Sequence, residues 1–255
     1  MARQRHLNKA PITEALVEIG VRRAFDETNT TMLAAFTERL QKNFPGRFQE
    51  EKKEIFQGTL FFQPSSHPKH KSQVACVGHR YDSKDGRHVV QARTDGYTFN
   101  WLKPYEDWES LRREAYGAWQ VYRDSLPPEI ITRIAIRFIN QIELPGPIID
   151  FDDYFTAAPP IPKDLPQVYA GFLSRLAIPF DDGRVMASLT QSFQPHINPS
   201  VVPVIMDIEV TNTVMLESQS EGSDRITWEA MDSLRAIKNK VFFESITEKL
   251  AGLLE

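Results

Sequence analysis

Apolar and polar residues alternate near the start of the chain. Every second position between residues 15 and 21 is Ala, Val or Ile, whereas Glu14 and Glu18 fall on the opposite parity. A period of two places these two sets on opposite faces of a strand, one buried and one solvated. The apolar spacing then becomes that of a helix and ends at Pro45 and Gly46, so the pattern predicts a strand followed by a helix.

Turn residues divide the next part of the chain into short segments. The segments are rich in β-branched or aromatic residues, and Asp-Gly pairs separate several of them. Because connections this short join antiparallel neighbours, the pattern predicts an antiparallel meander. The predicted strands are residues 55–62, 74–81, 88–93 and 97–102, with an exposed loop at residues 63–73.

Long amphipathic stripes indicate two helices. Residues 106–126 carry large apolar side chains on one stripe, and Pro127 and Pro128 end it. A terminal helix is predicted to begin near residues 224–227 and to continue to Leu250. Its apolar stripe consists of Trp228, Met231, Leu234, Val241, Phe242, Ile246 and Leu250.

The segment between these helices has the periodicity of strands. Residues 130–144 alternate so that Asn140 shares a face with several isoleucines, while Arg133 and Arg137 lie opposite. Three further strand candidates follow, at residues 168–178, 184–193 and 204–214.

Six prolines between residues 145 and 166 mark the main division of the chain. Proline removes a backbone donor and breaks both ladders and helices, so we predict a link here. The predicted domains are an N-terminal half at residues 1–145, a proline-rich link at 146–166 and a C-terminal half at 167–255. The predicted fold class is α+β, with two antiparallel-sheet halves each backed by a long amphipathic helix. This arrangement suggests a pseudo-duplication. The sequence does not decide whether the two halves share one continuous sheet.

Composition is that of a folded protein without a strong charge. A chain of 255 residues with 41% hydrophobic residues can bury a sizeable core, and a formal charge of −4 gives no general attraction to phosphate or anionic lipid. Its apolar runs fall short of the roughly 18 residues that span a bilayer, and no signal-peptide pattern follows the basic N-terminus. The single cysteine, Cys76, excludes an intrachain disulfide. We therefore expect a cytoplasmic protein without membrane contact.

Three sequence blocks lie far apart along the chain. They are APITEAL at residues 10–16, RFINQI at residues 137–142 and NKVFFESIT at residues 239–247. Together they resemble a sporadically distributed bacterial family of uncharacterised proteins with an API-x-EAL motif, an R-[FY]-I-N motif and a C-terminal N-x-x-F-F-x-x-I-T motif. The resemblance spans nearly the whole chain and implies no particular reaction. The sporadic distribution of such a family is typical of accessory genes.

Charged residues repeat at strand spacing in both long predicted strands. Glu14 and Glu18 project from one face of the first strand, and Arg133 and Arg137 repeat that spacing later. If the strands adjoin, the arginines would bind a carboxylate or phosphate, and the paired carboxylates would bind a cation or transfer protons. With Asn140, which interrupts an apolar stretch, these residues form the candidate ligand-binding site. Cross-strand ion pairing on a solvated face is the alternative.

Histidines offer little evidence for a metal centre. His79 and His88 lie on adjacent predicted strands, where a hairpin would bring them near Asp82 or Asp85, but polar residues on the wet face of a hairpin are the favoured explanation. Cys76 sits in an apolar run and is interpreted as a small buried hydrophobe. We predict no metal ligand, no cofactor and no catalytic residue, and an enzyme activity is undecided with a lean towards none.

Three functions compete on this sequence. The leading hypothesis is a non-catalytic interaction or regulatory protein that acts through a protein partner, and a homo-oligomer is compatible with it. The second is a small-molecule-binding protein or enzyme that uses the polar strand face; a deep cavity there would favour it, whereas a shallow ion-paired surface would favour the first. The third, disfavoured by nearby acids, is nucleic-acid binding through Arg3, Arg5, Lys9, Arg22, Arg23 and residues 69–71.

Overall fold

The computed structural model describes residues 1–23, 29–49, 52–62, 70–146, 150–167, 169–193 and 201–255. Within these residues the strands are β1 (Ile12–Arg22), β2 (Lys53–Phe62), β3 (His70–Asp82), β4 (His88–Arg93), β5 (Gly96–Leu102), β6 (Ile130–Pro145), β7 (Phe172–Phe180), β8 (Val185–Phe193) and β9 (Val201–Glu217). The α-helices are α1 (Asn29–Asn43), α2 (Trp108–Ser125), α3 (Ser223–Glu244) and α4 (Glu248–Leu253). Two short 3₁₀ helices are η1 (Phe151–Asp153) and η2 (Asp181–Gly183).

All described strands join one antiparallel sheet in the order β2-β3-β4-β5-β1-β6-β9-β8-β7. The α+β class and the antiparallel meander from β2 to β5 are therefore confirmed, and the sheet is continuous through the middle of the molecule. β1 and β6 form its central pair, with Leu16 opposite Arg137 and Glu18 opposite Ala135. This pairing brings together two strands that are more than 100 residues apart in sequence.

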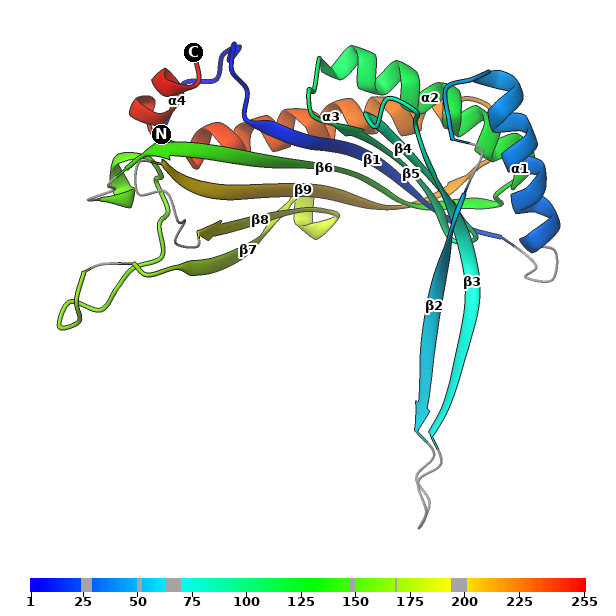
Figure 1. Ribbon diagram of the computed structural model, residues 1–255, viewed down its shortest axis with the longest axis horizontal. Helices are drawn as coiled ribbons and strands as arrows, with labels where there is room; N and C mark the ends of the chain where they lie inside the picture. Colours follow the sequence, from blue (N-terminus) through cyan, green and yellow to red (C-terminus); the bar gives the residue numbers. More distant parts are fainter. Residues whose placement is uncertain (24–28, 50–51, 63–69, 147–149, 168, 194–200) are drawn as a thin grey trace.

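Helices α2 and α3 lie on the same side of the sheet (Figure 1). Period-two alternation in β1 buries Ala15, Val17 and Ile19 completely beneath them. From the helices, Trp119 and Leu234 fill the space above the strands. Each large apolar side chain buried in this way contributes roughly 1.5–3 kcal/mol, so the helix–sheet layer is the main source of stability.

The β2–β3 hairpin extends away from the body on the side opposite α2 and α3 (Figure 1). Of the exposed loop predicted at residues 63–73, residues 70–73 belong to β3 and residues 63–69 lie outside the described residues. Among the described residues, no helix is long and apolar enough to cross a membrane.

The predicted terminal helix is in fact two helices. α3 ends at Glu244, and α4 begins after Thr247, whose side chain accepts a hydrogen bond from the Leu250 backbone N–H at 3.3 Å. Between them the chain turns to pair with the segment after η1, where the Thr247 N–H donates to the Tyr154 carbonyl at 2.9 Å. The continuous-helix prediction was wrong because apolar spacing persists through a break that tertiary hydrogen bonds create.

Candidate functional site

Four of the five predicted site residues lie together on the sheet face opposite α2 and α3. This surface, called the polar face below, is formed by β1, β6 and β9, which lie side by side in the sheet. It consists of Glu14, Glu18, Arg133, Arg137, Asp207 and Glu209.

The charges on the polar face are paired with one another. Arg133 contacts Glu18 at 2.6 Å and Glu209 at 2.8 Å, while both nitrogens of the Arg137 fork contact Asp207, at 2.8 and 2.5 Å. The hydrogen bonds to Asp207 raise the pKa of Arg137 above its ordinary value. These partly exposed pairs hold each other in place, and because the polar face has four carboxylates and two arginines, it stays net negative.

Two hollows accompany these ion pairs. One, of about 220 Å³, is bordered by Glu14, Glu18 and Arg137, and another, of about 400 Å³, lies between Arg137 and β7 and β8. Glu14 accepts a hydrogen bond from the Asn100 amide, so it too has a partner. The sequence thus predicted the proximity of these residues, and the structure adds that each of them has a polar partner on the same face.

Asn140, the fifth predicted residue, lies on the other face of the sheet. Its side chain is buried, and its amide donates to the carbonyls of Phe138 and Met206 at 3.3 and 3.0 Å. The sheet therefore separates Asn140 from the four charged residues, and the five do not converge on one site.

The basic residues considered for nucleic-acid binding are dispersed. Lys9 precedes β1 and Arg22 ends it, so about 35 Å of strand separates them. Arg5 is paired with Glu248 at 2.8 Å and with Glu255 at 2.5 Å. Residue 69 of the basic loop lies outside the described residues. The described part of this set forms no single basic surface.

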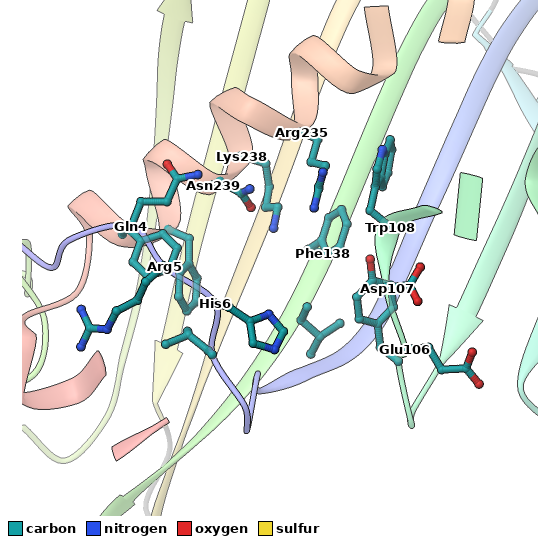
Figure 2. A pocket seen from close by; sticks show the side chains of 15 residues that line it. Gln4, Arg5, His6, Glu106, Asp107, Trp108, Phe138, Arg235, Lys238 and Asn239 are labelled. Atoms are coloured by element: carbon teal, nitrogen blue, oxygen red, sulfur yellow. The ribbon is translucent and has the colours of Figure 1, made fainter. Parts of the chain in front are cut away.

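A larger cavity opens on the helix side, beneath the C-terminal part of α3 (Figure 2). Its volume is about 480 Å³, and its walls come from the segment before β1, the first residue of β1, the β5–α2 connection, the first residue of α2, β6 and α3. We call it the Lys238 cavity. The lining residues are Gln4, Arg5, His6, Leu7, Ile12, Tyr105, Glu106, Asp107, Trp108, Phe138, Arg235, Lys238, Asn239, Phe242 and Phe243.

Lys238 is the unusual group of this cavity. Its side chain belongs to the inward stripe of α3, one turn after Leu234, and the residue is only 9% exposed. The ammonium lies 4.1 Å from the ring centroid of Phe138, and it has no hydrogen bond or carboxylate partner among the described residues. Burial, together with the charge of Arg235, lowers the pKa of Lys238 to about 7. The amine is therefore poised between its charged and neutral forms near neutral pH.

The other charged groups around the cavity are already engaged. The Arg235 guanidinium lies 5.7 Å from the Trp108 ring centroid and 3.7 Å from the Glu109 carboxylate. Asp107 caps α2 by accepting from the Ser110 backbone N–H at 2.7 Å. Lys238 therefore stands apart as the buried cation of this lining that lacks an anionic partner within the described chain.

Tyr105 and Asn239 provide neutral polar groups beside Lys238. Burial raises the pKa of Tyr105 well above its ordinary value, so the phenol stays protonated and can donate. Figure 2 shows Asn239 next to Lys238 on the α3 side of the cavity. Neither side chain has a hydrogen-bond partner among the described residues, so both are available to a bound molecule.

Sequence reasoning missed Lys238, although a signal was present. The residue occupies an apolar-stripe position of α3, four residues after Leu234 and three before Val241. A long cationic side chain at such a position either extends to solvent or is held in an enclosed site. The periodicity of the helix was used to place its apolar residues, and the charged exception within the same stripe was passed over.

Comparison with protein families and with curated proteins finds no match. The resemblance of the three sequence blocks to a sporadic bacterial family and the cytoplasmic location therefore stay predictions.

Proposed function

We propose that this protein binds a small organic anion in the Lys238 cavity, with an apolar or aromatic body and a carboxylate or phosphate head. The observation that carries the proposal is the buried ammonium of Lys238, which lacks an anionic partner within the described chain. A cavity of about 480 Å³ lies in the size range of small-molecule sites, which is roughly 300–1,000 Å³. A small-molecule function was also considered from the sequence, but on the polar strand face and not in this cavity.

The chemistry of the lining defines the ligand class. Phe138, Trp108 and Phe242 line the cavity and would contact the body of the ligand, and the amine of Lys238 lies 4.1 Å from the Phe138 ring centroid. An anionic head beside that amine would stabilise its charged form, because an opposite charge favours protonation of a buried lysine. Tyr105 and Asn239 would add hydrogen bonds that orient the head.

The test compares an anion with its neutral isostere. The probes are 2-naphthoate and 2-naphthamide, and titration calorimetry measures the affinity of each for the full chain. We expect wild type to prefer the carboxylate and Lys238→Met to lose that preference by at least about tenfold, which is 1.4 kcal/mol.

Lys240→Met provides the matched control, since Lys240 is exposed on the same helix. This variant should retain the preference for the carboxylate. Equal affinities of wild type for the two probes, or an undiminished preference in a folded Lys238→Met protein, would contradict the proposal.

Docking of a protein partner on the polar face is the second candidate function, and it was the leading hypothesis from the sequence. The observation that favours it is the interleaving of arginines and carboxylates, such as Arg133 between Glu18 and Glu209. A mixed pattern of this kind suits a partner of mixed charge, whereas its excess of carboxylates would repel a phosphate backbone.

A charge reversal tests this second candidate. A protein captured reproducibly from the native host by wild type should be lost with Arg137→Glu. Arg225→Glu, on the exposed side of α3, should still capture it. Equal capture by both variants would place the partner elsewhere.

We also infer that the chain contains two related halves that meet at the β1–β6 pair. In support, β1 and β6 each start a series that ends in a strand followed by a long helix, β5–α2 in one case and β9–α3 in the other. On this inference β6 belongs to the second half, and the division falls at Pro127 and Pro128, ahead of the proline-rich link.

A further inference from the structure

A β-bulge at the base of the β2–β3 hairpin brings two metal-binding side chains to one face. In the ladder, Glu54 pairs with His79 and Ile55 with Gly78, but Phe56 pairs with Cys76, so the register skips one residue of β3. Residues three apart in a regular strand point to opposite faces. The extra residue of the bulge reverses this parity and places Cys76 on the side of His79.

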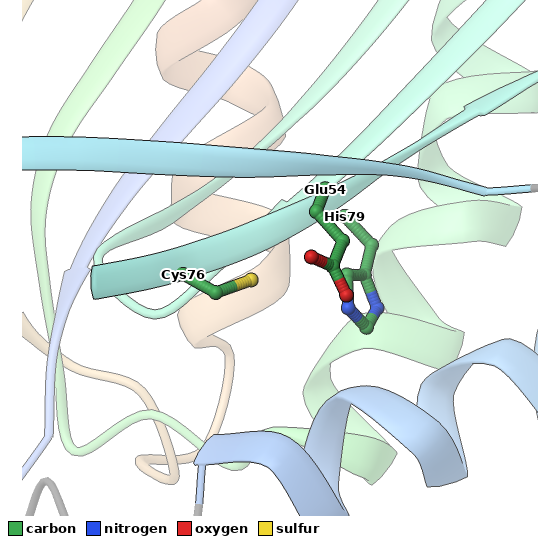
Figure 3. Close-up of side chains that lie close together, drawn as sticks. All are labelled: Glu54, Cys76 and His79. Atoms are coloured by element: carbon green, nitrogen blue, oxygen red, sulfur yellow. The ribbon is translucent and has the colours of Figure 1, made fainter. Parts of the chain in front are cut away.

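The cross-strand neighbour Glu54 completes a compact cluster (Figure 3). One oxygen of Glu54, the sulfur of Cys76 and one ring nitrogen of His79 all lie within 4.8 Å of one another. The histidine is buried, the cysteine is half-buried and the carboxylate is exposed, so the group is open on one side. Three different ligand types thus converge from two neighbouring strands.

A hydrogen-bond chain behind His79 fixes its tautomer. The Thr37 hydroxyl donates its one proton to the Leu33 carbonyl at 2.9 Å. In the 2.8 Å hydrogen bond between the Thr37 and Tyr81 hydroxyls, Tyr81 is therefore the donor. The Tyr81 oxygen then accepts from Nδ1 of His79 at 3.2 Å. This leaves Nε2 as the ring nitrogen with a free lone pair, and a hydrogen bond on the other nitrogen is the usual support of a metal-binding histidine.

We propose that Glu54, Cys76 and His79 bind a Zn²⁺ ion through three protein ligands, with a fourth position open to water or another ligand. The combination of thiolate, imidazole and carboxylate suits zinc, whereas Mg²⁺ and Ca²⁺ prefer oxygen ligands alone. On binding, the Cys76 thiol releases its proton to solvent, and its thiolate and the carboxylate balance the two charges of the ion.

Cobalt titration of the reduced full-length protein tests the proposal. Co²⁺ replaces zinc in such sites and reports thiolate ligation through a sulfur-to-cobalt charge-transfer band. We expect one equivalent of Co²⁺ to saturate this band and Zn²⁺ to abolish it by displacement. Cys76→Ser should lose the band, and Glu54→Gln should weaken the metal affinity at least about tenfold.

Two further variants separate the site from adventitious binding. Tyr81→Phe keeps the ring but removes the support of His79, so it should weaken affinity roughly 10- to 100-fold. Glu129→Gln changes an exposed carboxylate outside the cluster and should leave the affinity unchanged. Absence of the charge-transfer band in wild type, or metal binding that both Glu54→Gln and a folded Tyr81→Phe leave unchanged, would overturn the proposal.

Discussion

Two buried titratable side chains carry much of the physical interest at the scale of single residues. Lys238 lies under α3 without an anionic partner in the described chain, and both ring nitrogens of His88 lack hydrogen bonds while the ring packs 4.5 Å from the Trp101 ring centroid. Burial lowers the pKa of each group, because the folded protein disfavours the charged form. Folding therefore shifts both groups towards the neutral form relative to the unfolded chain.

Replacing Lys238 with Met should change how stability depends on alkaline pH. The unfolded lysine has a pKa near 10.5 and the folded one near 7, so between these values the unfolded chain binds the extra proton. Stability of wild type should then rise with pH, by up to about 1.4 kcal/mol per pH unit relative to Lys238→Met. Denaturant unfolding of both proteins from about pH 7 to about pH 9 measures the difference. Parallel curves would show that this amine titrates normally.

His88 should affect the stability of the protein at acidic pH. Its pKa is lowered from 6.5, first by burial and then by the charge of Arg47, against a smaller opposing effect of Asp85. The unfolded state therefore takes up the proton first as the pH falls below about 6.5, and the folded state loses stability. His88→Phe, which keeps an aromatic ring beside Trp101, should lose less stability on acidification than wild type. Thermal unfolding at neutral and acidic pH tests this expectation.

The candidate sites were predictable only where the strand period is regular. Glu18 and Arg133 were expected to meet because alternation fixes which face each residue occupies, and they do. Cys76 and His79 were not expected to meet, since a bulge in the ladder changes the parity and leaves no mark in the residue pattern. Lys238 was missed because its burial depends on the residues that surround it in the fold, which its spacing along the helix does not reveal.

At the scale of elements, two carboxylates of α3 contact α2: Asp232 accepts from the Trp108 indole at 2.7 Å, and Asp224 has three partners. Asp224, in the first turn of α3, accepts hydrogen bonds from the Trp119 indole at 3.1 Å and the Gln120 amide at 2.9 Å. It also pairs with Arg123 at 2.7 Å. All three partners lie in the second half of α2, so this contact fixes where the two helices meet above the sheet.

Asp224→Ala should destabilise the fold by about 2–3 kcal/mol, because it leaves a buried indole N–H unpaired and removes a charge from the helix N-terminus. Glu221→Ala, which alters an exposed acid just before α3, should change the free energy of unfolding by less than about 0.5 kcal/mol. Equal effects of the two substitutions, measured by denaturant unfolding, would show that the junction contributes nothing specific.

Most elements followed from local pattern, but their order in the sheet did not. The strand at β6 was predicted at residues 130–144 and is found at Ile130–Pro145, and helix α2 was expected at residues 106–126 and lies at Trp108–Ser125. The proline-rich stretch indicates a break in regular structure, yet it cannot reveal that β6 pairs with β1 and β9 on either side. Long-range pairing depends on surfaces that form only when distant segments meet.

On the scale of the whole molecule, the β1–β6 pair connects the two sides of the sheet. If the chain divides at Pro127 and Pro128, co-expressed fragments 1–127 and 128–255 should associate through this pair into a folded complex. A cut within β6, between residues 137 and 138, should fail, because it divides a central strand that has partners on both edges. Co-purification and circular dichroism of the two fragment pairs measure the outcome; equal recovery would contradict the inferred division.

The central position of β1 also has a consequence for synthesis on the ribosome. β6 is translated more than 100 residues after β1, a delay of roughly 5–20 seconds at usual rates of elongation. Neither edge of β1 has its native neighbour until β5 is made, and one edge stays unpaired until β6 follows, while its Val and Ile side chains are not yet covered by the helices. Nascent chains of this protein should therefore depend on chaperones that shield β1 until β6 arrives.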